Sequence, residues 1–256
     1  MKKIAICYFS YHEDIDFLKL SLSSLQKTIE KYDDYETKIY VFDDGRCKEK
    51  IKKDELEVPC TLIQTNFNRN GNLNGFDCIN GMFTEYVKLS QDFAYDYLIK
   101  LDSDCVLNSL DFIKNVENKL ASLGDNIIEN LGQIGSYFAQ ICCYGCCQTF
   151  TQLGVGVIYN LCRHMVAQEK PEEKVMRKRV DNGWNEDKVV SVLMEMCPVI
   201  RASLEQFEIR GHINAFEHPN EDYSLWTSVA FKPNRYGAKG WSREKSLEKM
   251  KRFIEQ

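Results

Sequence analysis

The sequence predicts an α/β protein whose mostly parallel central sheet is flanked by helices. Short, continuous apolar runs alternate with helical patterns over the first hundred residues, which is typical of buried parallel strands. Polar residues stand at the ends of three of these runs, at Ser10, Asp43 and Asp102. The chain has 256 residues, 44% of them hydrophobic, so it is long enough for one large α/β domain or two small ones. In such sheets we expect functional groups at the carboxyl ends of the strands.

The first half reads strand–helix–strand–strand–helix–strand. The four predicted strands are the apolar runs Ile4–Ser10, Lys38–Phe42, Cys60–Gln64 and Tyr95–Leu101. Apolar residues at spacings of three and four predict a helix from about Asp14, on Ile15, Leu18, Leu22, Leu25 and Ile29. After a polar loop over residues 66–72, a second helix is expected through Ile79, Met82, Tyr86 and Val87.

The second half is less regular. Its expected elements are a helix Ser109–Leu120, strands Gly132–Ile141 and Gln152–Tyr159, helices Asn160–Gln168 and Asp187–Met196, and a basic tail helix from Ser242. No linker-like stretch and no internal repeat interrupts the chain. We therefore expect one continuous domain.

Composition and charge exclude several classes of protein. The formal net charge of −5 argues against a nucleic-acid binder, which needs a basic face to neutralise phosphates. No apolar stretch reaches the roughly 18 residues that span a bilayer. The apolar run after Met1-Lys2-Lys3 is too short for a signal peptide, and the 11 cysteines are odd in number and scattered. These features favour a cytoplasmic protein.

The strongest chemical signal is the triplet Asp102-Ser103-Asp104 at the end of a predicted buried strand. Two acids there are costly unless a cation compensates their charge, and in extended chain they point the same way. Mg²⁺ or Mn²⁺ held by one or two carboxylates and bridging substrate phosphates fits this pattern. An acidic turn before the next helix is the structural alternative.

Two further acidic pairs accompany the triplet. Asp43-Asp44-Gly45 follows the second strand, where a carboxylate can accept hydrogen bonds from a uracil ring N–H or a ribose hydroxyl, although Asp-Gly also suits a plain turn. Glu186-Asp187 opens a helix, a place that carboxylates favour whatever their function. One carboxylate near a sugar phosphate can deprotonate an acceptor hydroxyl, and the preceding Trp184 can stack on a sugar.

Together, these motifs and their order resemble the nucleotide-sugar glycosyltransferases of GT-A type, in particular the inverting, family-2-like bacterial enzymes. The resemblance covers residues 3–196. It implies a GT-A, Rossmann-like fold with a smaller, mixed acceptor-side region, in a single domain 1–256. Residues 1–107 would form the nucleotide-binding half and 108–256 the acceptor-binding half. The implied activity is metal-dependent transfer of a sugar from a nucleoside diphosphate to a hydroxyl, with inversion, in bacterial-type polysaccharide synthesis.

The resemblance also implies roles for individual residues. Asp187 would be the base, with Glu186 helping to hold the acceptor and Trp184 binding it. Asp102 and Asp104 would hold Mn²⁺ or Mg²⁺. The expected nucleotide-sugar-binding residues are Phe9, Ser10, Tyr11, Asp43, Asp44, Asp102 and Ser103.

A histidine near the C-terminus is a further metal ligand in some GT-A enzymes. His212 and His218 are the two candidates, and we favour His218 for its turn-like context before Pro219. The cluster Cys142-Cys143-Tyr144-Gly145-Cys146-Cys147 lacks the second cysteine pair that structural zinc sites use, so apolar packing is its expected role.

Two rival functions stay open. Asp102-Ser103-Asp104 also resembles the nucleophile loop of haloacid-dehalogenase-like phosphatases, in which Asp102 would attack phosphate, although Cys105 replaces the usual glycine. Alternatively, a GT-A-like domain could bind nucleotide or glycan without turnover. The expected partners of a transferase are a nucleotide sugar, with UDP-sugar favoured, and a glycan or lipid-linked acceptor. The basic tail is either a solvated helix or a peripheral contact with the inner face of a membrane.

Overall fold

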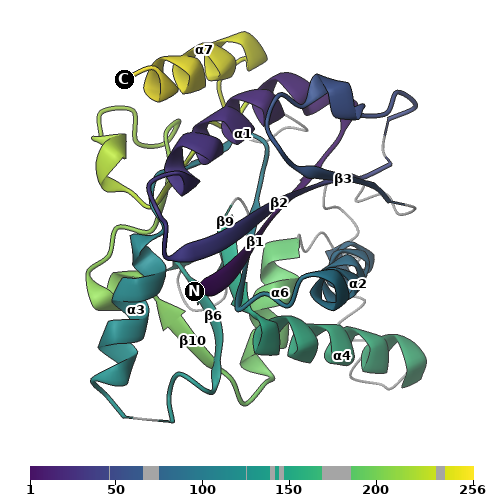
Figure 1. Ribbon diagram of the computed structural model, residues 1–256, viewed down its shortest axis with the longest axis vertical. Coiled ribbons are helices and arrows are strands. Elements are labelled where there is room, and N and C mark those ends of the chain that lie inside the picture. Colours follow the sequence, from purple (N-terminus) through teal and green to yellow (C-terminus); the bar gives the residue numbers. More distant parts are fainter. Residues whose placement is uncertain are drawn as a thin grey trace.

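The structure is a computed structural model that describes residues 1–45, 47–65, 75–124, 126–138, 142–143, 147–168, 186–234 and 240–256. A seven-stranded sheet lies at its centre, in the order β10-β6-β9-β4-β1-β2-β3 (Figure 1). Its strands are β1 (Lys2–Ser10), β2 (Tyr35–Asp43), β3 (Thr61–Gln64), β4 (Tyr97–Leu101), β6 (Leu131–Gly135), β9 (Cys147–Thr151) and β10 (Ile200–Ser203).

Most neighbouring strands of this sheet run parallel. The β1–β2, β1–β4, β2–β3 and β6–β10 pairs are parallel, and only β9 runs against its neighbours β4 and β6. Ser10 is in register with Asp43, and Tyr8 with Leu101. The carboxyl ends of β1, β2 and β4 therefore meet at one edge of the sheet, where β9 begins.

Helices cover both faces of the sheet (Figure 1). The helices α2 (Gly75–Asp92), α4 (Gln152–Gln168) and α6 (Glu186–Glu195) pack on one face, and α1 (Ile15–Ile29) and α3 (Asp111–Ala121) on the other. The strands alternate accordingly: Cys7 and Phe9 face the first layer, whereas Ile6 and Tyr8 face the second. Burial of continuous apolar strands on both faces is what the sequence pattern predicts.

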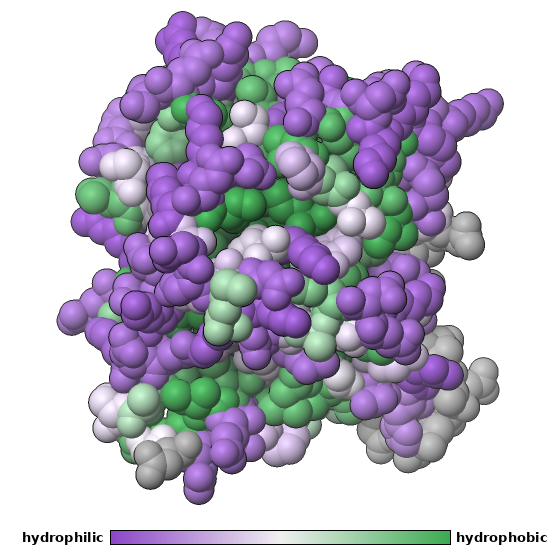
Figure 2. All heavy atoms as spheres, in the orientation of Figure 1, coloured by the Kyte–Doolittle hydropathy of each residue, from purple (hydrophilic) through white to green (hydrophobic). Residues whose placement is uncertain are grey.

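Two small sheets extend this core. In one, β12 (Ser228–Ala230) pairs with β11 (His212–Asn214) and β5 (Cys105–Leu107), and in the other, β7 (Tyr137–Phe138) pairs with β8 (Cys142–Cys143). The tail helix α7 (Arg243–Ile254) packs on α1 and the first small sheet through Met250. Its N-cap is Ser242, whose side chain accepts a hydrogen bond from the Lys245 amide. Hydrophilic side chains dominate the top of the molecule in Figure 2, where α7 lies.

The predicted fold class is confirmed, because a mostly parallel sheet lies between helices beside a smaller mixed region. The predicted strand Gln152–Tyr159, however, is wrong. These residues form the first two turns of α4, and β9 ends just before them at Thr151. The buried positions Val155, Ile158, Cys162 and Met165 follow a helical period.

Two glycines in the first turns of α4 differ in their surroundings. Gly154 is buried against β6, and a Cβ atom there would lie 2.0 Å from the carbonyl oxygen of Gly132. At Gly156 a Cβ atom would meet nothing within 4 Å. Gly154 therefore permits the close approach of α4 to the sheet, whereas Gly156 leaves room for a side chain.

We expect Gly154→Ala to lower the free energy of unfolding by at least about 2 kcal/mol, because the backbone of β6 or α4 must shift. The matched change Gly156→Ala should raise it by about 0.5–1 kcal/mol, because alanine favours a helix. Urea denaturation of the two variants measures both values. Equal destabilisation by both changes would contradict this account of the helix.

Candidate functional site

The candidate site lies at the sheet edge where β1, β2 and β4 end. Ser10 ends β1, and its hydroxyl is buried with no hydrogen-bond partner in the described part of the chain. Buried hydroxyls of this kind are normally satisfied by water or a ligand. The neighbouring Asp44 amide donates a 2.8 Å hydrogen bond to the Ser10 carbonyl, which ties the ends of β1 and β2 together. Ser10 thus marks this edge as a place where a polar ligand could bind.

Asp43, at the end of β2, is fully buried and organises the loop that follows. Its carboxylate accepts hydrogen bonds from the amides of Gly45 at 3.2 Å and Ile51 at 3.0 Å. The Lys50 ammonium lies 3.8 Å from the same carboxylate. Asp43 therefore has a structural task in addition to the predicted nucleobase contact, which stays a prediction.

The other residues predicted for the nucleotide pocket are buried as well. The Phe9 ring stacks on Phe42 with 4.5 Å between centroids, within the apolar core. Tyr11, Asp44 and Ser103 are each less than a tenth exposed. These residues lie at the sheet edge formed by the carboxyl ends of β1, β2 and β4. Contact with a nucleotide remains a prediction for each.

The Asp102-Ser103-Asp104 triplet forms a tight turn directly after β4. The Cys105 amide donates to the Asp102 carbonyl, and the Phe231 amide donates to the Asp104 carbonyl at 2.8 Å. The turn is thereby fastened to the segment after β12. The Asp102 side chain is 27% exposed, whereas Asp104 is 9% exposed overall. The triplet thus has one partly exposed carboxylate, that of Asp102, and one largely buried carboxylate, that of Asp104.

A lysine that the sequence analysis did not single out lies beneath this turn. Lys100, the residue before the last of β4, is fully buried, and its Nζ lies 2.6 Å from Asp102 Oδ1 and 2.7 Å from Glu186 Oε1. A charged residue within the apolar run Tyr97–Leu101 requires a partner, and this was the signal available in the sequence. Lys100 joins two acidic motifs that lie far apart in the chain.

Glu186 and Asp187 open α6 but have different environments. The Glu186 carboxylate is buried, contacts Lys100 with one oxygen and accepts a hydrogen bond from Cys78 Sγ at 3.4 Å with the other. Asp187 is partly exposed and accepts a 3.3 Å hydrogen bond from Gln148 Nε2 of β9. Desolvation, followed by the charge of Glu186, raises the pKa of Asp187 to about 7. A carboxylate with this pKa is suited to accept a proton near neutral pH.

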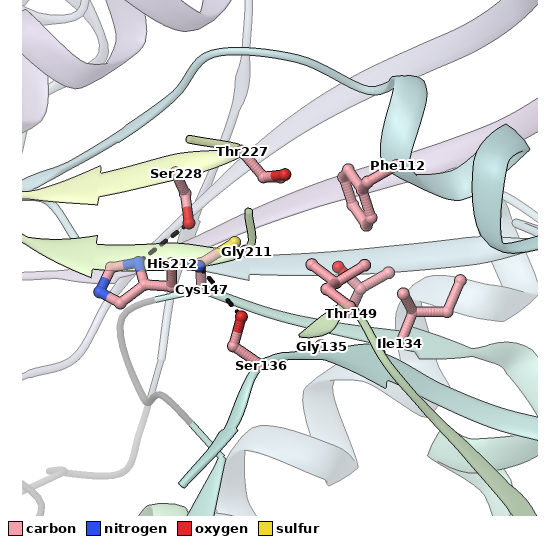
Figure 3. A pocket seen from close by; sticks show the side chains of 11 residues that line it. Phe112, Ile134, Gly135, Ser136, Cys147, Thr149, Gly211, His212, Thr227 and Ser228 are labelled. Carbon is pink, nitrogen blue, oxygen red and sulfur yellow. Dashed lines mark hydrogen bonds between the residues drawn. The ribbon is translucent and has the colours of Figure 1, made fainter. Parts of the chain in front are cut away.

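The two candidate histidines lie in different settings. His212, at the start of β11, is buried, and its Nδ1 lies 2.9 Å from Ser228 Oγ (Figure 3). It lines a small pocket beside Ser136 and Cys147 and interacts electrostatically with Asp102. Burial, followed by the positive charge of Lys232, lowers the pKa of His212 to about 3, so the imidazole is neutral. His218 lies on the exposed stretch after β11.

The residues of the triplet fit a hard divalent cation by the type of their donors. Within the described ranges, no group of three or more His, Cys, Asp or Glu side chains has the arrangement of a metal site. Mg²⁺ in nucleotide sites, however, is commonly held by one or two carboxylates plus substrate phosphates and water. Asp102 and Asp104 meet that requirement, and they are the residues that would hold the ion.

Some predictions fall outside the described residues. Trp184 and residues 144–146 of the cysteine cluster are among these. Cys147 is described, and burial raises the pKa of its thiol to about 11, so it stays protonated. No helix in the described part of the chain has the length and apolarity that a bilayer crossing needs.

Comparison with known proteins identifies the fold. No protein-family model and no curated protein matches the sequence. Among solved structures, the chain is similar to a glycosyltransferase involved in the glycosylation of the major capsid of PBCV-1, with a TM-score of 0.51. The two share 11% sequence identity, and the match covers 97% of this chain and 98% of that one. This chain therefore has a glycosyltransferase-like fold.

The loop after β2 provides a test of the role of Asp43. Asp43→Ala should lower the free energy of unfolding by about 2 kcal/mol or more, because the buried Ile51 amide and the partly buried Gly45 amide lose their acceptor. Asp43→Asn, which keeps one carbonyl oxygen, should cost less. Urea denaturation gives the stabilities, and hydrogen exchange reports the amides of Gly45 and Ile51. An alanine variant as stable as the wild type would show that this carboxylate does not hold the loop.

Proposed function

We propose that this protein is a metal-dependent glycosyltransferase that moves a sugar from a nucleoside diphosphate to a hydroxyl acceptor, with inversion at the anomeric carbon. The observation that carries the proposal is the bridge from Lys100 to Asp102 and Glu186 on a glycosyltransferase-like fold. It joins the acidic triplet to the acidic pair that includes a base of raised pKa. These are the two parts that sugar transfer requires.

On the donor side, Asp102 and Asp104 would hold Mn²⁺ or Mg²⁺ together with the diphosphate. When bound, the ion offsets negative charge that grows on the leaving diphosphate. The buried Ser10 hydroxyl and the end of β2 lie at the same sheet edge, where the nucleoside would bind. A UDP-sugar is the favoured donor, because an acidic side chain at the end of β2 can accept the uracil N–H.

On the acceptor side, Asp187 would act as the general base. The acceptor hydroxyl gives its proton to Asp187 while its oxygen forms a bond to the anomeric carbon. The bond from that carbon to the phosphate oxygen breaks, and the nucleoside diphosphate leaves with the electron pair. Attack from the side opposite the leaving group inverts the anomeric centre.

The acceptor and the setting are further parts of the proposal. A glycan or a lipid-linked sugar would supply the hydroxyl, in bacterial-type polysaccharide synthesis. The basic residues of α7 suit a peripheral contact with an anionic membrane surface on the cytoplasmic side. Trp184, just before the acidic pair, would stack on the acceptor.

Two substitutions separate the donor and acceptor roles. Asp104→Ala should abolish both transfer and Mn²⁺-dependent binding of UDP, because a carboxylate ligand is lost. Asp187→Asn should keep UDP binding and lower kcat by about 10²–10⁴-fold, because the base is lost. Calorimetric titration with UDP and Mn²⁺, and product analysis from a panel of UDP-sugars, measure the two effects.

The matched control is Asp34→Asn, an exposed carboxylate just before the amino end of β2 and so at the sheet edge opposite the site, which should leave both quantities unchanged. Full activity of Asp104→Ala would refute the metal assignment. Loss of UDP binding in Asp187→Asn would refute the base assignment. Hydrolysis of an aryl phosphate by the wild type, without sugar transfer, would favour the phosphatase instead. Binding of UDP without any turnover would indicate a non-catalytic domain.

The raised pKa of Asp187 predicts the pH dependence of transfer. Below its pKa the carboxyl is protonated and cannot accept the hydroxyl proton, so kcat/KM should rise with pH around a midpoint of about 7. The residual activity of Asp187→Asn should lack this limb. A midpoint near 4, the ordinary range of an aspartate, would contradict the assignment.

A further inference from the structure

We propose that Lys100 is a positioning residue that fixes Asp102 and the first turn of α6 in one arrangement, so that Asp187 is held beside the donor site. The inference rests on the function proposed above and goes beyond it by adding a residue that touches neither donor nor acceptor. Lys100 acts through its two carboxylate partners.

The burial of Lys100 shows how strongly its partners are constrained. The side chain has no exposure to water, and it comes from β4, which lies between β1 and β9 in the sheet. An unpaired ammonium there would be very costly, so the carboxylates of Asp102 and Glu186 must both stay within reach. Contacts of 2.6 and 2.7 Å, each with a single carboxylate oxygen, satisfy that requirement.

Two neighbouring residues, one on β4 and one on β9, hold the start of α6. Lys100 and Gln148 are directly opposite each other in the antiparallel β4–β9 ladder. Lys100 contacts Glu186, and Gln148 contacts Asp187, which are consecutive residues of α6. Two adjacent sheet positions therefore hold the start of this helix, and the Cys78 thiol of α2 holds Glu186 from its other side.

The charges around the base point to the same role. Asp187 is close to Glu186 on its own helix, to Lys100 and Asp102 from β4 and the turn after it, to Gln148 of β9, and to Lys232 after β12. Glu186 and Asp102 raise its pKa, whereas Lys100 and Lys232 lower it. Without Lys100, three carboxylates would repel one another, and the first turn of α6 would move away from the triplet.

The test is Lys100→Met, which keeps most of the length of the side chain and removes its charge. We expect kcat for sugar transfer to fall by about 100-fold, as misplacement of a reacting group by about 1 Å does, while KM for the donor rises by less than about 10-fold. The control Lys88→Met makes the same change at an exposed ion pair with Glu85 and should leave kcat and KM unchanged.

A second variant allows for the case that the unpaired, buried carboxylate of Glu186 prevents folding. In Lys100→Met/Glu186→Gln, the buried charge of Glu186 is removed together with its partner, so the melting temperature should return toward the wild-type value. A positioning role predicts that kcat of this stable double variant stays well below that of Glu186→Gln alone, a comparison that allows for any contact of Glu186 with the acceptor. A merely structural role predicts that kcat recovers, together with stability, to the value of Glu186→Gln.

The outcomes separate this inference from the proposed function. If the wild-type protein transfers sugar and kcat is low in both lysine variants, the inference is supported. If the wild-type protein transfers sugar but kcat is unchanged in Lys100→Met or recovers in the double variant, the inference alone is overturned. Failure of both variants to fold also overturns the inference alone. A wild-type protein that transfers no sugar from any nucleotide donor overturns the proposed function, and the inference with it.

Discussion

A single buried ammonium group sets the geometry of the candidate site. Lys100 lies in the central strand of the sheet with no access to water, and physical chemistry requires that its charge be paired. Its two partners, Asp102 and Glu186, come from a turn and a helix that are 84 residues apart (186 − 102). If either carboxylate moved away, the buried ammonium would lose a partner at a high cost in free energy. The sheet edge and the start of α6 therefore behave as one unit.

The carboxylates at this edge divide by exposure. Asp43 and Glu186 are buried, and their oxygens are engaged by backbone amides, by Lys100 and by a thiol. Asp102 and Asp187 are partly exposed and sit beside the buried ones. The buried acids therefore shape the loop and the helix, and the exposed acids are the ones that a ligand can reach. The Glu186-Asp187 pair thus combines one structural and one accessible carboxylate.

The sequence predicts the parallel part of the fold well because β1, β2 and β4 are apolar runs buried on both faces. It fails at Gln152–Tyr159, where apolar residues at every second position suit a strand as well as a helix, and only packing of Gly154 on β6 decides. The sheet of β5, β11 and β12 consists of three-residue strands, and its β5–β12 pair joins residues more than 100 positions apart, so the local sequence gives little signal for it. The Lys100–Glu186 contact likewise depends on the folded topology, although a lysine in an apolar run indicates that some partner exists.

Two titratable groups near the acids, His212 and Cys147, are neutral and leave the net charge of the site unchanged. Burial keeps the His212 imidazole unprotonated and the Cys147 thiol protonated, so neither adds charge at neutral pH. In the described part of the chain, the carboxylates of Asp102, Glu186 and Asp187 then lie near the ammonium groups of Lys100 and Lys232. This excess of negative charge would repel a bare diphosphate and attract a divalent cation. The nucleotide-sugar donor proposed above would therefore need an accompanying cation to balance its charge at this edge of the sheet.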